Sequence, residues 1–300
     1  MPSSQARAHR SPGGPTPDRR SNSMEEIAGG SLVSLPGRGI SSRVASERPV
    51  PVDALNLETP RTALGPTVTP AGSFFVRSHF PVPELRVGAW KLAISGEVDR
   101  PRAWSLADLH DLPRKRVVAT LECAGNGRKG FRRPAPGELR WGDHAVGTAV
   151  WEGVPLSVLL NEAGLRCEAH HLVFSGADYG DPGSRACRFS RSLSLDLTGG
   201  RDDVLVATEM NGRSLPPEHG APARLVVPGW YGMAWVKWLS TIVARRTPFR
   251  GYFQAARYVY RSRQGGRVVV EPVRRIRVKS LIIDPGGAEP LVRGRRYPIS

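Results

Sequence analysis

The segment Thr120 to Arg128, with the sequence TLECAGNGR, decides how the rest of this chain is interpreted. The apolar, β-branched run Val117 to Leu121 predicts a short buried strand that leads into it. The residues after Cys123 are small, so the backbone there can approach another group closely. Arg128 and Lys129 follow, and a positive field lowers the pKa of a cysteine thiol. A thiolate is a nucleophile or a soft metal ligand, whereas a lone cysteine is more commonly a buried apolar residue.

The composition is that of a loop-rich soluble protein. Of 300 residues, 40% are hydrophobic and 23% are charged, and 33 Gly with 27 Pro favour an α+β or β architecture over a helical bundle. The longest uncharged apolar stretch, Leu225 to Val236, is about half as long as a bilayer span, so no membrane span is expected. Three cysteines are too few for a disulfide scaffold and lack zinc-site spacing.

The strong positive charge does not by itself indicate a nucleic-acid partner. The net charge is +16, but 43 basic residues include only 5 lysines, and this arginine bias is typical of GC-rich coding. Residues 245–300 hold 14 Lys and Arg against 3 Asp and Glu. A basic site for an anionic cofactor or a small anionic substrate explains this charge equally well, so we expect no nucleic-acid binding.

Residues 1–54 are rich in Ser, Pro, Gly and Arg and lack apolar periodicity, which predicts a disordered basic tail. The pair Arg19-Arg20 resembles part of a twin-arginine export signal, but no apolar region follows it. We therefore expect no signal peptide and a cytoplasmic protein. Met24 is an alternative start.

Local signals predict several helices and strands in the remaining chain. Ser105 with Asp108 three residues later is typical of a helix N-terminus, and a second helix is expected from Leu156 to Gly164, where glycine ends it. The strands expected from the apolar patterns cover residues 90–98, 171–175 and 223–227, with a β-rich stretch over 267–283.

TLECAGNGR closely resembles the molybdenum-ligand loop of the sulfite oxidase family. Other segments resemble that family in the same order, so the resemblance covers about residues 55–300. These segments are LETP (57–60), FFVRSHFPVP (74–83), DDVLVA (202–207), EMNG (209–212), LP (215–216), HGAPAR (219–224), PG (228–229) and VKWL (236–239).

The resemblance implies an α+β fold of the sulfite oxidase type, with a molybdopterin-binding catalytic domain over residues 55–250. Cys123 would be the protein ligand of the molybdenum, beside the soft dithiolene sulfurs of the cofactor. Five further residues match the family's cofactor contacts. They are His79, Asp178, His219, Arg224 and Lys237. Without the family context, each lone His or Asp would be interpreted as a hydrogen-bonded core residue.

The implied reaction is the oxidation of sulfite, or of a related sulfur compound, to sulfate by oxo transfer. Arg77 and Arg128 match two arginines of the family's anion pocket. The family also has a tyrosine next to the reacting oxygen, and Tyr258 matches it best, with Tyr252 and Tyr260 as alternatives.

Some features depart from the animal members of the family. Ser78 stands where asparagine is common. No arginine precedes Val236-Lys237-Trp238, so the resemblance leaves one pterin or phosphate contact unassigned. The chain has no Cys-x-x-Cys-His motif and no haem module, so electrons are expected to pass to a separate acceptor, such as a cytochrome c. Alternatives are a dehydrogenase acting on a carrier-bound sulfur compound, a nitrate-reducing relative, and a non-catalytic basic binding protein.

Residues 251–300 resemble a linker followed by the opening strands of the family's immunoglobulin-like dimerisation domain. Such a sandwich needs about seven strands and about 100 residues, so we expect an incomplete domain with the last residues poorly packed or lying along the domain surface. The usual homodimer is then expected to be weakened or absent. Leu281, Ile282 and Ile283 would form an exposed apolar edge.

Overall fold

The computed structural model describes residues 55–133, 137–183, 185–198, 200–285 and 291–299. The chain divides into two units, Met1–Val44 and Ala45–Ser300. The first unit and residues 45–54 of the second lie outside the described residues, and so does the tail expected over residues 1–54. Within the described part of the chain, no helix is long and apolar enough to cross a membrane.

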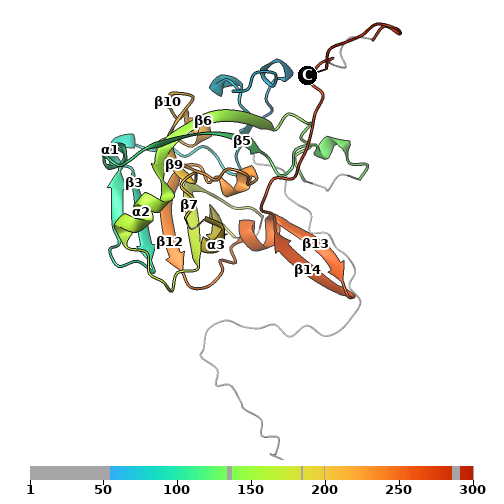
Figure 1. Cartoon of the computed structure of the whole chain (residues 1–300). Coiled ribbons are helices and arrows are strands. Elements are labelled where there is room, and N and C mark those ends of the chain that lie inside the picture. The colour runs from blue at the N-terminus through green and yellow to red at the C-terminus, as the bar shows by residue number, and fades with distance from the viewer. Residues whose placement is uncertain (1–54, 134–136, 184, 199, 286–290, 300) are drawn as a thin grey trace, which may run out of the picture. The chain divides into compact units, whose positions relative to one another are not determined.

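Two five-stranded sheets form the framework of the second unit (Figure 1). The first sheet is antiparallel, with the order β10-β9-β6-β5 and with β11 also paired to β9. Its strands are β5 (Lys115–Glu122), β6 (Val146–Pro155), β9 (Leu205–Met210), β10 (Arg213–Ser214) and β11 (Arg224–Val226).

The second sheet is mixed, with the order β4-β3-β12-β7-β8. Only its central pair, β3 and β12, is parallel. Its strands are β3 (Lys91–Gly96), β4 (Arg102–Ser105), β7 (His171–Gly180), β8 (Cys187–Ser194) and β12 (Leu239–Arg245). The sheet-rich α+β class expected from the sequence is confirmed.

Short elements connect the strands and cover the sheets. The paired strands outside the two large sheets are β1 (Asn56–Leu57) with β2 (Val76–Arg77) and β13 (Val259–Gln264) with β14 (Arg267–Pro272). The α-helices are α1 (Leu106–Asp111), α2 (Leu156–Ala163) and α3 (Leu195–Thr198). The 3-10 turns are η1 (Arg61–Ala63), η2 (Ala71–Ser73), η3 (Val87–Ala89), η4 (Arg128–Gly130), η5 (Pro217–His219) and η6 (Gly232–Ala234), and η7 (Phe253–Arg257) is a π-helical turn.

Both helix boundaries predicted from the sequence are confirmed. The Ser105 Oγ atom accepts a hydrogen bond from the Asp108 backbone N–H at 3.2 Å, and the Asp108 carboxylate accepts one from the Ser105 N–H at 2.7 Å. This reciprocal pair satisfies two N–H groups that the first helical turn leaves without partners. Helix α2 ends at Gly164, which has a φ of +66° that only glycine adopts easily.

Residues from both sheets form one hydrophobic core. Fully buried side chains from β3, β6, β7 and β12 meet in it, among them Leu92, Trp151, Phe174 and Ile242. Strands β6 and β9 approach so closely at Gly153 that a Cβ atom built there would lie 2.1 Å from the Val206 carbonyl oxygen. Any larger residue at position 153 would force these two strands apart.

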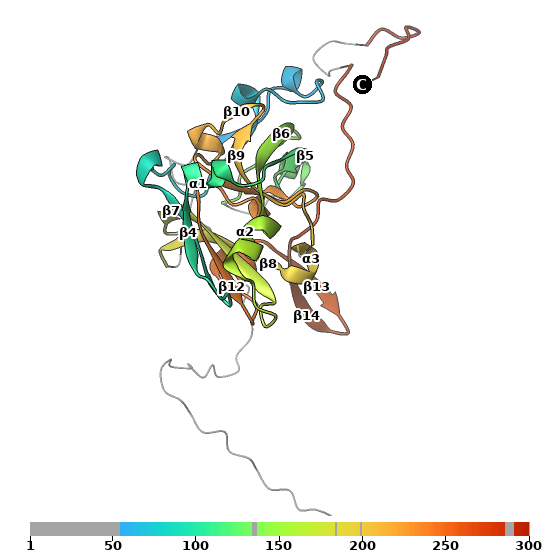
Figure 2. The same ribbon diagram turned by 60° about the vertical axis from the view of Figure 1, so that its left-hand side comes forward.

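The strands expected after position 272 are not confirmed. Strand β14 ends at Pro272, and the described residues 273–285 and 291–299 contain no further strand apart from a single bridge between Arg275 and Trp230. In both ribbon views, the segment after β14 runs as an extended chain past β5 (Figures 1 and 2). It is held by backbone contacts such as Ile276 N–H to Gly229 O at 3.0 Å. Two strand-like patterns cannot bury both faces of a sandwich. Residues 273–283 run along the domain, where Arg61 donates hydrogen bonds to the carbonyls of Ile282 and Ile283, whereas the described residues 291–299 extend away from it in both views (Figures 1 and 2).

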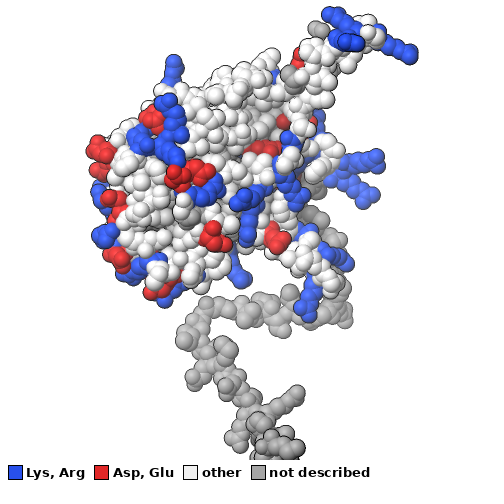
Figure 3. Space-filling model, in the orientation of Figure 1, with Lys and Arg blue, Asp and Glu red and all other residues white. Residues whose placement is uncertain are grey.

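The positive charge is distributed unevenly over the surface. In the view of Figure 3, acidic and basic side chains alternate over the sheets, whereas basic side chains predominate around the β13–β14 hairpin and the C-terminal segment. This agrees with the excess of arginine in residues 245–300 of the sequence.

Candidate functional site

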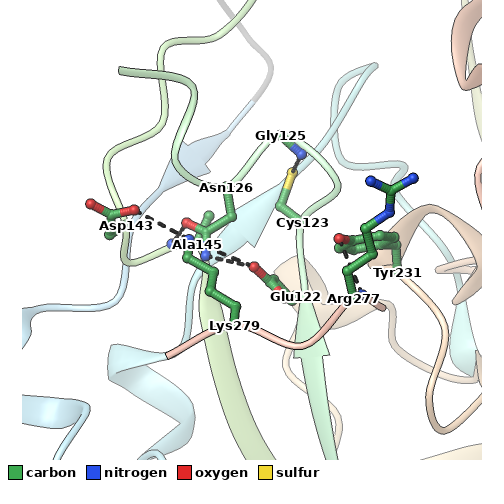
Figure 4. Close-up of polar contacts among 9 residues, drawn as sticks. All are labelled: Glu122, Cys123, Gly125, Asn126, Asp143, Ala145, Tyr231, Arg277 and Lys279. Carbon is green, nitrogen blue, oxygen red and sulfur yellow. Dashed lines mark hydrogen bonds and ion pairs between the residues drawn. The ribbon is translucent and has the colours of Figure 1, made fainter. Parts of the chain in front are cut away.

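The loop after β5 presents the thiol of Cys123 from a fixed backbone (Figure 4). The Cys123 N–H donates to the Ala145 carbonyl at 2.9 Å, and the Cys123 carbonyl accepts from the Asn126 N–H at 2.9 Å. The Gly125 N–H points at the Cys123 sulfur, at 3.4 Å. The chain turns back at Gly127, which has a φ of +84°. The sulfur is therefore held in one position by the backbone of its own loop.

The Asn126 side chain closes this loop. Its Nδ2 donates to Glu122 Oε1 at 3.0 Å, and its Oδ1 accepts from the Ala145 N–H at 3.0 Å. Lys279, from the segment after β14, lies 3.2 Å from Asp143 Oδ1 and 3.9 Å from Glu122 Oε1 (Figure 4). The asparagine of the CAGN sequence thus has a structural role beside the cysteine.

The pKa of the Cys123 thiol is raised, so the expectation that neighbouring cations would lower it is wrong. Burial has the largest effect, because it disfavours the charged thiolate. The Gly125 N–H and the charges of Arg77 and Arg128 act in the opposite direction but do not outweigh burial. Without a metal, Cys123 is a buried thiol, and coordination would be needed to remove its proton.

Cys123 lines a cavity to which both large sheets and several loops contribute. Its polar lining residues are Arg77, Ser78, His79, Cys123, Asp178, Glu218, His219, Arg224, Lys237 and Tyr258. Eight of the nine residues predicted from the sequence therefore lie around one cavity.

The cavity has a volume of about 60 Å³. The Arg77 guanidinium in its wall is folded back and donates to the Ser78 carbonyl and to Asn56 Oδ1.

Asp178 and Lys237 are a buried acid and a buried base in the wall of the cavity. Burial raises the pKa of Asp178 to about 7, against the lowering effect of Lys237. Burial also lowers the pKa of Lys237 well below its usual range. The Lys237 ammonium donates to Ser78 Oγ and to the Glu218 carbonyl, each at 2.8 Å. Asp178 Oδ1 is buried and accepts no hydrogen bond from the described residues.

His219 and Arg224 are adjacent and buried. Burial lowers the pKa of His219 to about 4 and that of Arg224 to about 9, so at neutral pH the imidazole is neutral and the guanidinium is charged. Arg224 donates to the carbonyls of His219 and Trp235, at 2.9 and 3.2 Å, and lies 4.9 Å from the ring centre of Trp151. Its buried Nε has no hydrogen-bond acceptor among the described residues.

Tyr258 is the tyrosine that reaches the cavity. Its hydroxyl lies 2.8 Å from His79 Nε2. Burial raises the pKa of Tyr258 and lowers that of His79, so both groups are neutral near pH 7. Tyr252 instead points toward the Pro182 carbonyl, and Tyr260 is 40% exposed on the hairpin. Neither alternative lines the cavity.

Arg128 lies beside the cavity rather than in its lining. Its guanidinium packs over the backbone of Gly125, where a Cβ atom would be 2.9 Å from Arg128 Cζ. It forms an ion pair with Glu138, which also binds Arg257. Arg128 was expected from its place in the cysteine loop, whereas Glu138 and Arg257 lie in no motif and were not predicted from the sequence.

The comparison with known proteins gives these residues a context. Residues 79–253 match the family described as the oxidoreductase molybdopterin binding domain. The Gallus gallus sulfite oxidase is 38% identical over 217 residues, which are 69% of this chain and 45% of the relative. Inducible nitrate reductase (NADH) 2 of Glycine max is 35% identical over 193 residues, which are 62% of this chain and 22% of the relative.

A solved structure also resembles this fold. The sulfane dehydrogenase SoxCD from Paracoccus pantotrophus has a TM-score of 0.66 and 30% sequence identity, and the match covers 84% of this chain and 66% of that chain. The chain spans less than half of the length of the two enzymes above.

The residues present fit a molybdopterin. A soft sulfur ligand and several cations face one cavity, which suits a metal and an anionic phosphate group. The buried Asp178 Oδ1 and Arg224 Nε atoms lack hydrogen-bond partners among the described residues, and ring nitrogens or phosphate oxygens would supply them. The cavity is smaller than sites that hold cofactor-sized molecules, and release of Arg77 from the Ser78 carbonyl and Asn56 Oδ1 would enlarge it. On the sequence match and this set of donors, the chain belongs to the molybdopterin-binding oxidoreductase family that includes the sulfite oxidases.

Proposed function

We propose that this enzyme oxidises sulfite, or a closely related sulfur oxyanion, and passes the electrons to a separate acceptor. The observation that carries the proposal is the convergence of a buried thiol, a neutral phenol and arginine cations on one cavity. Cys123, Tyr258 and Arg77 line this cavity, and Arg128 packs against the Cys123 loop. A small dianion needs converging cations, and these arginines supply them.

The buried polar residues would hold the cofactor. Cys123 would bind the molybdenum, Asp178 would accept hydrogen bonds from the pterin, and Lys237 with Arg224 would face the phosphate and pterin. His219 would be a neutral neighbour of these groups. When bound, the molybdenum cofactor supplies the two-electron redox chemistry and the transferable oxygen atom.

The side chains around the reacting atoms bind and orient the anion. Arg77 and Arg128 would neutralise the oxyanion, and release of Arg77 from the Ser78 carbonyl would free its guanidinium for this purpose. Tyr258 would donate its hydroxyl hydrogen to a substrate oxygen, while His79 Nε2 keeps the phenol oriented at 2.8 Å. Because the phenol pKa is raised by burial, the hydroxyl keeps its proton at neutral pH.

The overall reaction converts sulfite and water to sulfate, two protons and two electrons. The electrons require an acceptor outside this chain, for which a cytochrome c is our candidate. The similarity to sulfane dehydrogenase SoxCD favours sulfur chemistry, but nitrate reductases match this sequence about equally well. Nitrate reduction is therefore the second candidate.

Steady-state assays of the molybdenum-loaded protein test the proposal. Sulfite with an artificial electron acceptor, and nitrate with a reduced electron donor, are supplied separately at pH 7 to 8. We expect turnover with sulfite and little with nitrate. The opposite result would replace sulfite oxidation by nitrate reduction, and activity with neither substrate would refute both.

A further inference from the structure

Glu138 forms an ion pair with two arginines beside the Cys123 loop. Its Oε1 accepts a hydrogen bond from Arg257 Nη1, and its Oε2 contacts Arg128 Nη1. The exposed fractions of the three side chains are 11% for Glu138, 26% for Arg128 and 17% for Arg257. At this depth an ion pair is screened less by water than a surface pair, so these contacts affect the local potential substantially.

The two guanidinium groups converge on one point from segments far apart in the sequence. Arg128 begins η4 and packs over Gly125 in the cysteine loop. Arg257 ends η7, directly before Tyr258. The carboxylate of Glu138 therefore lies between the loop that carries the thiol and the turn that carries the phenol.

Glu138 lies in a strongly basic depression. Five arginines line this depression, which has a volume of about 420 Å³. They are Arg128, Arg133, Arg140, Arg257 and Arg261. Glu138 is the one carboxylate among the described lining residues, so the depression carries a formal charge of +4. Such a site attracts small anions.

We propose that Glu138 is an internal competitor for an oxyanion site formed by Arg128 and Arg257. Its two oxygens, each facing one guanidinium, occupy the place that two oxygens of a divalent oxyanion would take. The inference deepens the proposed function, because it makes the position beside the cysteine loop a site for the substrate or for the product sulfate. It also adds Arg257 as a residue that contacts the anion.

Competition of this kind limits how tightly the site holds a dianion. Two partly buried guanidinium groups without a counter-ion would bind sulfate and sulfite strongly, and the product would then leave slowly. A carboxylate that returns to the arginines when the anion leaves reduces this affinity. Among the described residues, the Oε2 atom of Glu138 has its ion pair with Arg128 and no further hydrogen bond, so an arriving anion has only this ion pair to displace at that oxygen.

The test is the affinity of the cofactor-loaded enzyme for sulfate, measured by titration calorimetry in a chloride-free buffer. Glu138→Gln keeps the shape of the side chain but removes its charge. We expect the Kd for sulfate to fall roughly 5- to 50-fold, the range for one partly exposed charge-assisted contact. The inhibition constant of sulfate in the sulfite assay should fall in parallel.

Glu152→Gln is the matched control. Glu152 is also shared by two arginines, Arg114 at 3.6 Å and Arg116 at 3.1 Å, but it lies on β6 outside the depression. We expect no change in sulfate affinity for this variant. Arg257→Gln is a second variant, for which the proposal predicts weaker sulfate binding. This variant also tests the proposed oxyanion site if Glu138→Gln does not fold.

An unchanged or higher Kd for sulfate in folded Glu138→Gln would show that Glu138 only positions Arg128, and the proposal would be overturned. Unchanged binding in Arg257→Gln would also overturn it. These outcomes are independent of the proposed function, since calorimetry does not require turnover. If the wild type shows no sulfite oxidation but Glu138→Gln binds sulfate more tightly, the proposed activity is refuted. The proposal about Glu138 then still holds.

Discussion

Replacing Asp178 by asparagine should have opposite effects on the stability of the cofactor-free chain and on its ability to hold the cofactor. The carboxyl group is buried in β7, and burial raises its pKa from 3.8 to about 7. Its Oδ1 has no hydrogen-bond partner among the described residues. Ionised Asp178 therefore destabilises the folded chain, whereas a cofactor donor would use this oxygen.

The pH dependence has a defined sign. Because the pKa is higher in the folded state, the stabilising effect of the proton is complete below pH 3.8 and is lost as the pH rises through about 7. A shift of about three units corresponds to at most about 4 kcal/mol, of which roughly 2 to 3 kcal/mol falls between pH 5 and 8. The Asp178 charge raises the pKa of Lys237 against the lowering effect of burial, so the difference between the two proteins includes this coupling as well as the proton on Asp178.

Urea unfolding of cofactor-free wild type and Asp178→Asn, followed by circular dichroism from pH 5 to 8, measures this difference. We expect the variant to gain about 2 to 3 kcal/mol relative to wild type over this range and to retain less molybdopterin. Asp111→Asn, at an exposed aspartate of α1, is the control and should show no such trend. Equal pH dependence of wild type and Asp178→Asn would refute the reasoning.

Three further predictions follow from the site and the core. Arg128→Gln should lower kcat/KM for sulfite about 10- to 150-fold, because one charge-assisted contact is lost; an unchanged kcat/KM would show that Arg128 does not bind substrate. Tyr258→Phe should slow turnover with only a small loss of stability from the missing hydrogen bond to His79, whereas Tyr252→Phe should leave turnover unchanged; slowed turnover in Tyr252→Phe alone would move the role to Tyr252. Gly153→Ala should destabilise the fold by about 1 to 3 kcal/mol or more in urea unfolding, since the new Cβ would meet the Val206 carbonyl at 2.1 Å; wild-type stability would show that β6 and β9 separate freely.

The sequence predicted correctly those helix ends that are determined by neighbouring residues. The Ser105 and Asp108 pair, and Gly164 after an apolar helix face, fixed the beginning of α1 and the end of α2 because capping involves only neighbouring residues. The prediction of a β-rich stretch over residues 267–283 was wrong beyond Pro272, where β14 ends. Its apolar residues lack partner strands, and a strand depends on pairing with distant residues.

The candidate site was predicted mainly through the family resemblance. Cys123 and its neighbours lie in recognisable motifs, and the structure brings them to one cavity. The resemblance ranked Tyr258 first, and the structure adds that neither alternative, Tyr252 nor Tyr260, lines the cavity. Glu138 and Arg257 are 119 residues apart and belong to no motif, so their ion pair appears only in the folded chain. The thiol pKa was mispredicted because the sequence shows nearby charges but not the extent of burial.

The most direct test compares sulfite-dependent reduction of an electron acceptor by wild type and Cys123→Ser, each with its molybdenum and pterin content measured. We predict about one molybdenum per chain and sulfite turnover in the wild type. We predict that Cys123→Ser still folds and binds pterin but has no measurable turnover, because a harder oxygen ligand alters the metal. Activity of Cys123→Ser within a few-fold of wild type, or a molybdenum-loaded wild type that does not oxidise sulfite, would contradict the account.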